Sequence, residues 1–85
     1  MTYSVKLHPK VNKFIKKADK ELAERILKKL RDLKQDPFRF LEHFEGQDFY
    51  KLRIGDYRAL IDVDKDRKIC FIRHLDHRSR IYKRK

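Results

Sequence analysis

The sequence has one cysteine, no tryptophan, two glycines and two prolines among its 85 residues. A single cysteine excludes an internal disulfide and any zinc site built on cysteine pairs. Cys70 lies within the apolar segment 69–72, which predicts a small buried hydrophobe. The histidines, at positions 8, 43, 74 and 77, lack metal-ligand spacing. Because a glycine-rich phosphate loop and a Ser-His-Asp order are also missing, we expect neither a metal nor a cofactor.

Long hydrophobic runs and lipidation signals are absent too, so a membrane location is not expected. The first six residues lack the apolar core of a secretory signal, which favours a cytoplasmic protein. A chain of this length fits one domain, 1–85, since a single core usually takes about 50–200 residues.

Negative charge is scarce: 24 Lys and Arg stand against 13 Asp and Glu, a formal net charge of +11. Such an excess favours a polyanionic partner, either a nucleic acid or an acidic protein. Net charge alone does not choose between RNA, DNA and an acidic segment of another protein.

The hydrophobic pattern predicts an α+β fold. Tyr3–Leu7 alternates as a strand does, and apolar residues then recur at three- and four-residue steps over two segments. Asp19 is a suitable N-cap for the second segment, and Asp36-Pro37 ends it. Three strands are expected near 49–54, 57–63 and 69–75, the last of them central, while 38–48 has no period and is expected to pack irregularly over the sheet edge. The prediction is an N-terminal strand, a helical hairpin packed on one face of a mostly antiparallel four-stranded sheet, and a basic C-terminal tail.

The strongest local signal is a hairpin that collects positive charge. Gly55-Asp56 has the composition of a two-residue turn, and folding there places Arg53 opposite Arg58. Because side chains alternate along a strand, Lys51 shares their face. Opposed arginines repel and weaken the ladder, so an anion, first of all phosphate, is expected beside them. The alternative is an ordinary solvated basic face.

The tail adds an aromatic ring among cations. Tyr82 could stack on a base or transfer a proton, or it could be a core or edge tyrosine. His77 is the one histidine beside several cations and could act as an acid or base, or be a plain surface residue. The last residues, Lys83 to Lys85, suit a general electrostatic contact.

Residues 44–58, followed by 77–82, resemble the RelE/ParE toxin superfamily. The shared elements are the Tyr50–Arg58 core and a later His-Arg-x-x-Ile-Tyr segment, and the order of elements agrees over the whole chain. RelE-type members are ribosome-dependent mRNA endonucleases that cut in the A site. ParE-type members share the scaffold and inhibit DNA gyrase.

The resemblance to RelE implies roles for individual residues. Lys51 and Arg53 would assist attack by the 2′-OH and neutralise phosphate, and Arg58 would stabilise the transition-state phosphate. Tyr82 would stack on or orient the nucleotide, completing the catalytic set, and Arg78 would contact RNA. The other expected RNA-binding residues are His77, Arg80 and Lys83. Cleavage would need no metal and would leave a 2′,3′-cyclic phosphate and a 5′-OH.

Two departures from RelE stand out. Asp76 takes the place of an arginine, and Arg53 that of a lysine, which favours phosphate binding over base catalysis because arginine stays protonated. Weaker activity, or a different acid such as His77, is therefore an open alternative, as are an inactive homologue and a ParE-like gyrase inhibitor. The family implies an acidic, RelB-like antitoxin in a toxin–antitoxin hetero-oligomer, with the ribosome and mRNA as the other partners.

Overall fold

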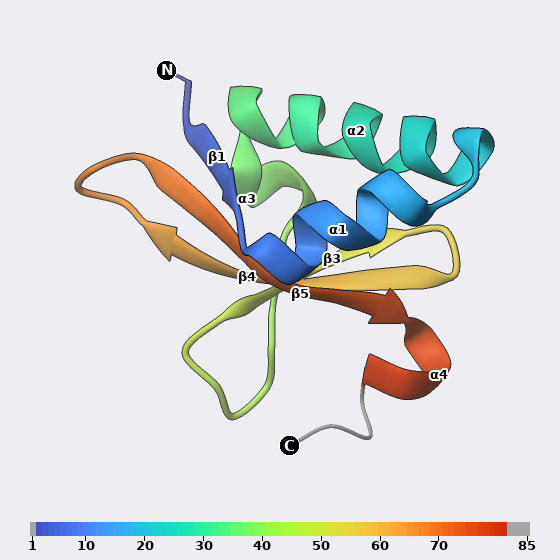
Figure 1. Ribbon diagram of the computed structural model, residues 1–85. Coiled ribbons are helices and arrows are strands. Elements are labelled where there is room, and N and C mark those ends of the chain that lie inside the picture. Colours follow the sequence, from blue (N-terminus) through green and yellow to red (C-terminus); the bar gives the residue numbers. More distant parts are fainter. Residues whose placement is uncertain (1, 82–85) are drawn as a thin grey trace.

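The computed structural model describes residues 2–81, so the predicted roles of Tyr82 and Lys83 lie outside the described residues. Two long helices cover one face of a single sheet, while α4 and the loop 44–49 extend from the other side (Figure 1). The elements in chain order are β1 (Ser4–Leu7), α1 (Pro9–Lys17), α2 (Lys20–Gln35), α3 (Pro37–Phe40), β2 (Glu42–His43), β3 (Tyr50–Ile54), β4 (Tyr57–Asp64), β5 (Ile69–His77) and α4 (Arg78–Ile81).

The helical hairpin is bounded by the residues that the sequence indicates. His8 caps α1, its Nδ1 accepting the N–H of Lys10 at 3.0 Å. Asp19 caps α2 by accepting the N–H of Leu22 at 2.9 Å, as predicted. Pro37, which has no N–H to donate, begins the short helix α3 directly after α2 ends.

The sheet has five strands in the order β1-β5-β4-β3-β2, so the predicted count of four is too low by one. The additional strand, β2, covers only two residues and pairs antiparallel with β3. A strand of this length cannot show a period of two, and for that reason the segment 38–48 looked irregular. β1 pairs parallel with β5 and the other pairs are antiparallel, which confirms a mostly antiparallel sheet.

The core lies between the helices and the sheet. It brings together apolar residues of both long helices and of β3, β4 and β5, including Ile26, Leu33, Leu52, Ile61 and Ile72, none more than 1% exposed. Cys70 is also fully buried, and this burial raises the pKa of its thiol to about 11. No helix in the described part of the chain is long and apolar enough to cross a membrane.

Candidate nucleic-acid interface

The sheet face turned away from α1 and α2 carries the predicted cations. Arg53 is the Cα partner of Arg58, which confirms the predicted register. The next pair, Leu52 and Ala59, points to the other side of the sheet and is buried. We call the surface that carries the cations the open face; in β3, β4 and β5 its members include Lys51, Arg53, Arg58, Leu60, His74 and Asp76. The turn that creates this register has a positive φ at Gly55, where a glycine costs little strain.

An internal anion, Glu42 of β2, already faces two of these cations. One of its carboxylate oxygens lies 3.7 Å from Lys51 Nζ and the other 3.5 Å from Arg53 Nε. The Glu42 side chain is half exposed, and exposed pairs of this length contribute only about 0–1 kcal/mol. Glu42 therefore lowers the repulsion within the open face without closing it to a stronger anion.

Arg58 is partly buried and tied to the β3–β4 turn. Its Nη1 donates to the carbonyl oxygens of Gly55 and Tyr57 at 2.7 and 2.8 Å. Its Nε is buried and has no hydrogen-bond partner among residues 2–81. Arg58 is thus a fixed guanidinium, and a buried donor without a partner favours an incoming acceptor.

A β-bulge in β5 decides which of its polar residues reach the open face. Ile61 pairs with Ile72 whereas Leu60 pairs with His74, so Arg73 is the extra residue. After the bulge, His74 and Asp76 share the open face, while Leu75 is buried in the core. Neither the place of His74 on this face nor the bulge was predicted from the sequence. Two polar residues between the core residues Ile72 and Leu75 were the available signal.

The same parity places His77 on the helix-covered side of the sheet. Its ring packs against Tyr57, at 5.4 Å between centroids, and Tyr57 in turn contacts Phe14 of α1. His77 Nδ1 accepts the N–H of Ser79 at 3.1 Å, the arrangement of an N-cap for α4. The structure therefore does not bring His77 together with Lys51 and the open-face arginines.

Asp76 is the buried acid of the open face, 9% exposed and opposite Arg58 in the register. Burial alone would raise the pKa of its carboxyl group. The hydrogen bond from the His77 N–H at 2.7 Å, the bond from Arg80 Nε at 2.9 Å and the nearby charge of His74 outweigh burial and lower that pKa. Asp76 is consequently an ionised carboxylate at neutral pH.

Aromatic rings border the open face beside β3. Phe44 and Phe49 contact each other, with ring centroids 5.0 Å apart. Lys51 Nζ lies 6.0 Å from the Phe44 ring, and the Arg73 guanidinium lies 4.8 Å above the Phe49 ring while bonding Asp62 at 3.3 Å. Cations interleaved with aromatic rings are typical of surfaces that bind single-stranded nucleic acid.

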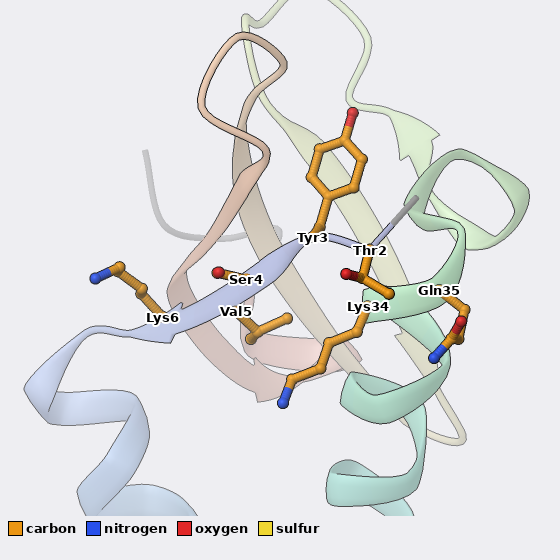
Figure 2. Close-up of a pocket in the computed structure, with 7 residues that line it drawn as sticks. All are labelled: Thr2, Tyr3, Ser4, Val5, Lys6, Lys34 and Gln35. Carbon is orange, nitrogen blue, oxygen red and sulfur yellow. The ribbon is translucent and has the colours of Figure 1, made fainter.

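A second surface lies at the β1 edge of the sheet. Figure 2 shows the residues that line a groove between β1 and the C-terminal end of α2. The volume of this groove is about 570 Å³. An apolar hollow of about 220 Å³ adjoins it and includes Leu27, which is 42% exposed. We call both together the β1 groove; its lining includes Val5, Lys6, Leu7, Leu27, Arg31 and Lys34.

The backbone of β1 has an unused side in this groove. The N–H groups of Ser4 and His8 donate toward β5, to the carbonyls of Lys68 and Ile72. Because N–H and C=O directions alternate along a strand, those of Val5 point away from β5, and none of the described strands covers that side. Basic side chains beside the edge, including Lys6 and Lys34, would attract an acidic segment.

Residues 2–81 contain no group of three or more His, Cys, Asp or Glu side chains that could hold a metal ion. The open face instead carries the guanidinium groups of Arg53 and Arg58 and the ammonium group of Lys51 on a sheet surface. Such groups bind and neutralise phosphate, and they stabilise charge that develops during its displacement.

The chain is similar to known toxins of toxin–antitoxin systems. Residues 5–82 match the model of the family described as the ParE toxin of the type II toxin–antitoxin system parDE. The candidate toxin RelE4 of Methanocaldococcus jannaschii is 30% identical over 89 residues, covering 98% of this chain and 94% of that protein.

Solved structures share the fold as well. RelE in the RelE–RelB complex of Pyrococcus horikoshii OT3 is similar with a TM-score of 0.78 and 32% identity, over 94% of this chain and 99% of that one. The RelBE2 complex of Mycobacterium tuberculosis gives a TM-score of 0.79 at 21% identity, over 91% and 99% of the two chains. The matched segment of 5–82 spans nearly the whole chain, and the protein therefore belongs to the RelE/ParE superfamily of toxins from type II toxin–antitoxin systems.

Proposed function

We propose that this toxin is a metal-independent endoribonuclease that cuts mRNA in the A site of the ribosome. The observation that carries the proposal is the open face, where Arg53 and Arg58 stand directly opposite each other with Lys51 beside them. Three cations kept together on one surface suit a phosphate with developing negative charge. An open sheet surface does not enclose a nucleotide. It suits a codon in the A site, because the ribosome already holds that codon in place. Because ribosomes are cytoplasmic, this activity would also place the protein in the cytoplasm.

The proposed reaction is an in-line displacement at phosphorus. The 2′-OH gives up its proton and its oxygen bonds to phosphorus, while the bond from phosphorus to the 5′-oxygen breaks and that oxygen takes up a proton. Lys51 assists on the attack side with Arg53, and Arg58 meets the charge on the phosphate oxygens. Tyr82 is the proposed stacking residue. The products are a 2′,3′-cyclic phosphate and a 5′-OH.

Gyrase inhibition is the second candidate function, because the matching family model is described as a ParE toxin. A gyrase inhibitor would cause DNA damage signalling without new mRNA ends, and its activity would not depend on the cations of the open face. An inactive homologue would do neither. These outcomes are separable in one expression experiment.

The experiment compares two double variants after brief induction in growing cells. Lys51→Ala with Arg58→Ala should restore growth and remove the mRNA 5′ ends that map within codons. Lys28→Ala with Arg67→Ala removes two equally charged but exposed residues, each paired with an aspartate elsewhere on the surface, and should remain toxic. Growth arrest that persists in the first variant contradicts the proposed site.

We further propose that an acidic, RelB-like antitoxin binds this chain in a hetero-oligomer, as in the relatives solved as RelE–RelB complexes. The β1 groove suits an acidic segment, because the Val5 backbone is open to strand addition, Leu27 offers apolar contact, and Arg31 and Lys34 supply charge.

A matched pair of substitutions tests the groove. Arg31→Glu, in the groove, should weaken capture of the co-expressed antitoxin about tenfold or more, since it places like charge against an acidic segment. Lys28→Glu makes the same charge change on the same helix outside the groove and should bind as the unsubstituted toxin does. Equal capture of both variants contradicts this docking site.

A further inference from the structure

The two described arginines of α4 have different partners. Arg78 is held at the β3–β4 turn, where its N–H donates to the Asp56 carbonyl at 2.8 Å and its Nε lies 3.9 Å from the Asp56 carboxylate. Arg80 Nε instead donates to Asp76 Oδ1 at 2.9 Å. Because Asp76 belongs to the open face, Arg80 is the α4 arginine that is joined to that surface.

The Asp76–Arg80 pair has the features of an anchor for a working guanidinium. The carboxylate is 9% exposed and is held by a second bond, from the His77 N–H at 2.7 Å. The Arg80 side chain is 60% exposed. Arginine has five N–H donors in a rigid fork, so one bond at Nε leaves the four donors on the two Nη atoms for another acceptor. The pair thus orients Arg80 and leaves most of its donors available.

The position of this pair points to its acceptor. Asp76 is the direct cross-strand partner of Arg58, and side chains so placed have Cβ atoms about 4.5–5.5 Å apart. Arg58 lies on β4, and Arg80 of α4 is bonded to Asp76 on the neighbouring strand β5, so the two arginines flank the same cross-strand pair. A phosphate bound beside Arg58 would therefore lie next to Asp76 and to the Arg80 side chain that Asp76 holds.

We propose that Arg80 is a phosphate-binding residue of the open face and that Asp76 is the positioning residue that holds it there. The inference rests on the proposed function, which supplies the phosphate as that of an mRNA. Asp76 would otherwise be a cost to the site, because its negative charge repels phosphate. Because Asp76 holds Arg80, the arginine loses less conformational entropy when it binds phosphate, and this gain offsets the repulsion.

Binding measurements at several salt concentrations test the assignment. The probe is a ribosome programmed with an mRNA whose A-site codon carries 2′-deoxy sugars and so cannot be cut. Arg80→Gln should weaken binding about tenfold and lower the slope of log K against log salt by about 0.7, the value for one contact to a single-stranded phosphate. Asp76→Asn should weaken binding less. In the Arg80→Gln background it should no longer weaken binding, because the carboxylate then has no arginine to hold and only repels phosphate.

The pair Asp64–Arg67 provides the matched control. It is an exposed Asp–Arg pair at 4.0 Å between the end of β4 and the β4–β5 loop, so Arg67→Gln and Asp64→Asn should leave affinity and slope unchanged. Arg80→Lys keeps the charge but not the fork; it should retain the slope while losing part of the affinity. Circular dichroism and thermal unfolding establish that each variant is folded.

Two results would overturn the inference. If Arg80→Gln matches Arg67→Gln in both affinity and slope, then Arg80 does not bind phosphate. If Asp76→Asn weakens binding equally with and without Arg80→Gln, then Asp76 does not act through Arg80. Both comparisons are made between variants of a toxin whose unsubstituted form binds programmed ribosomes. Failure of that protein to bind or cut them counts against the proposed function instead.

Discussion

At the scale of single residues, the open face is a set of cations whose mutual repulsion is lowered by two acidic side chains. Glu42 lies beside Lys51 and Arg53, and Asp76 holds Arg80. The two acids differ in exposure: Glu42 is half exposed and bound at longer distances, whereas Asp76 is buried and bound by short hydrogen bonds. Glu42 is therefore the easier of the two for an incoming phosphate to displace.

The ionisation of Asp76 predicts a dependence of stability on pH. Its folded pKa lies below the unfolded value of about 3.9, so the carboxylate stabilises the fold above about pH 4. This contribution is lost as the pH falls through the lower folded pKa. Asp76→Asn should cost about 1–3 kcal/mol in the free energy of unfolding at pH 7, and the difference from the unsubstituted protein should shrink toward pH 2.

Urea unfolding at several pH values measures this difference. Asp66→Asn, in the exposed β4–β5 loop, is the control and should change stability little at any pH. A deficit of Asp76→Asn that stays constant between pH 7 and pH 2 contradicts the assigned role of the carboxylate.

At the scale of elements, the sequence predicted regular segments well and irregular ones poorly. Asp19 and Pro37 mark the limits of α2, and the Gly55-Asp56 turn sets the register of β3 and β4, all from local chemistry. The bulge in β5 was not predicted. Residues 69–72 are apolar at both alternating positions, so their pattern does not show which later residues of β5 face the core. The short strand β2, which brings Glu42 to Lys51, depends on tertiary pairing that no local pattern encodes.

The bulge makes two single-residue deletions in β5 unequal. Deleting Arg73 removes the extra residue and leaves Leu75 facing the core, so the protein should fold with a modest loss of stability. Deleting Phe71 shifts the parity, placing Ile72 on the open face and Arg73 toward the core. The resulting loss of about 3–5 kcal/mol should unfold a domain of this size.

Circular dichroism and thermal melting of the two deletion variants, at equal concentration, distinguish these cases. A cooperative transition is expected for the Arg73 deletion and none for the Phe71 deletion. Similar melting curves for the two variants contradict the bulge position.

At the scale of the whole molecule, the net charge of +11 includes the basic residues of two separate surfaces. The open face lies on β3, β4 and β5, whereas the β1 groove lies at the opposite edge, between β1 and α2. Charge and family alone predicted a polyanionic partner, an RNA or an acidic protein. The proposed mRNA site and the proposed antitoxin site lie on different parts of the sheet, so under this proposal the two partners do not compete for the same atoms.

The most direct test of the open face as a nuclease site is in vitro cleavage on purified ribosomes. An mRNA labelled at its 5′ end is placed with a defined codon in the A site. It is then mixed either with the unsubstituted toxin or with the Lys51→Ala, Arg58→Ala double variant. We predict a cut within that codon, a 5′ fragment ending in a 2′,3′-cyclic phosphate, and a rate at least about 100-fold lower in the double variant. A programmed mRNA that stays intact with the unsubstituted toxin, or equal cleavage by the double variant, would contradict the account.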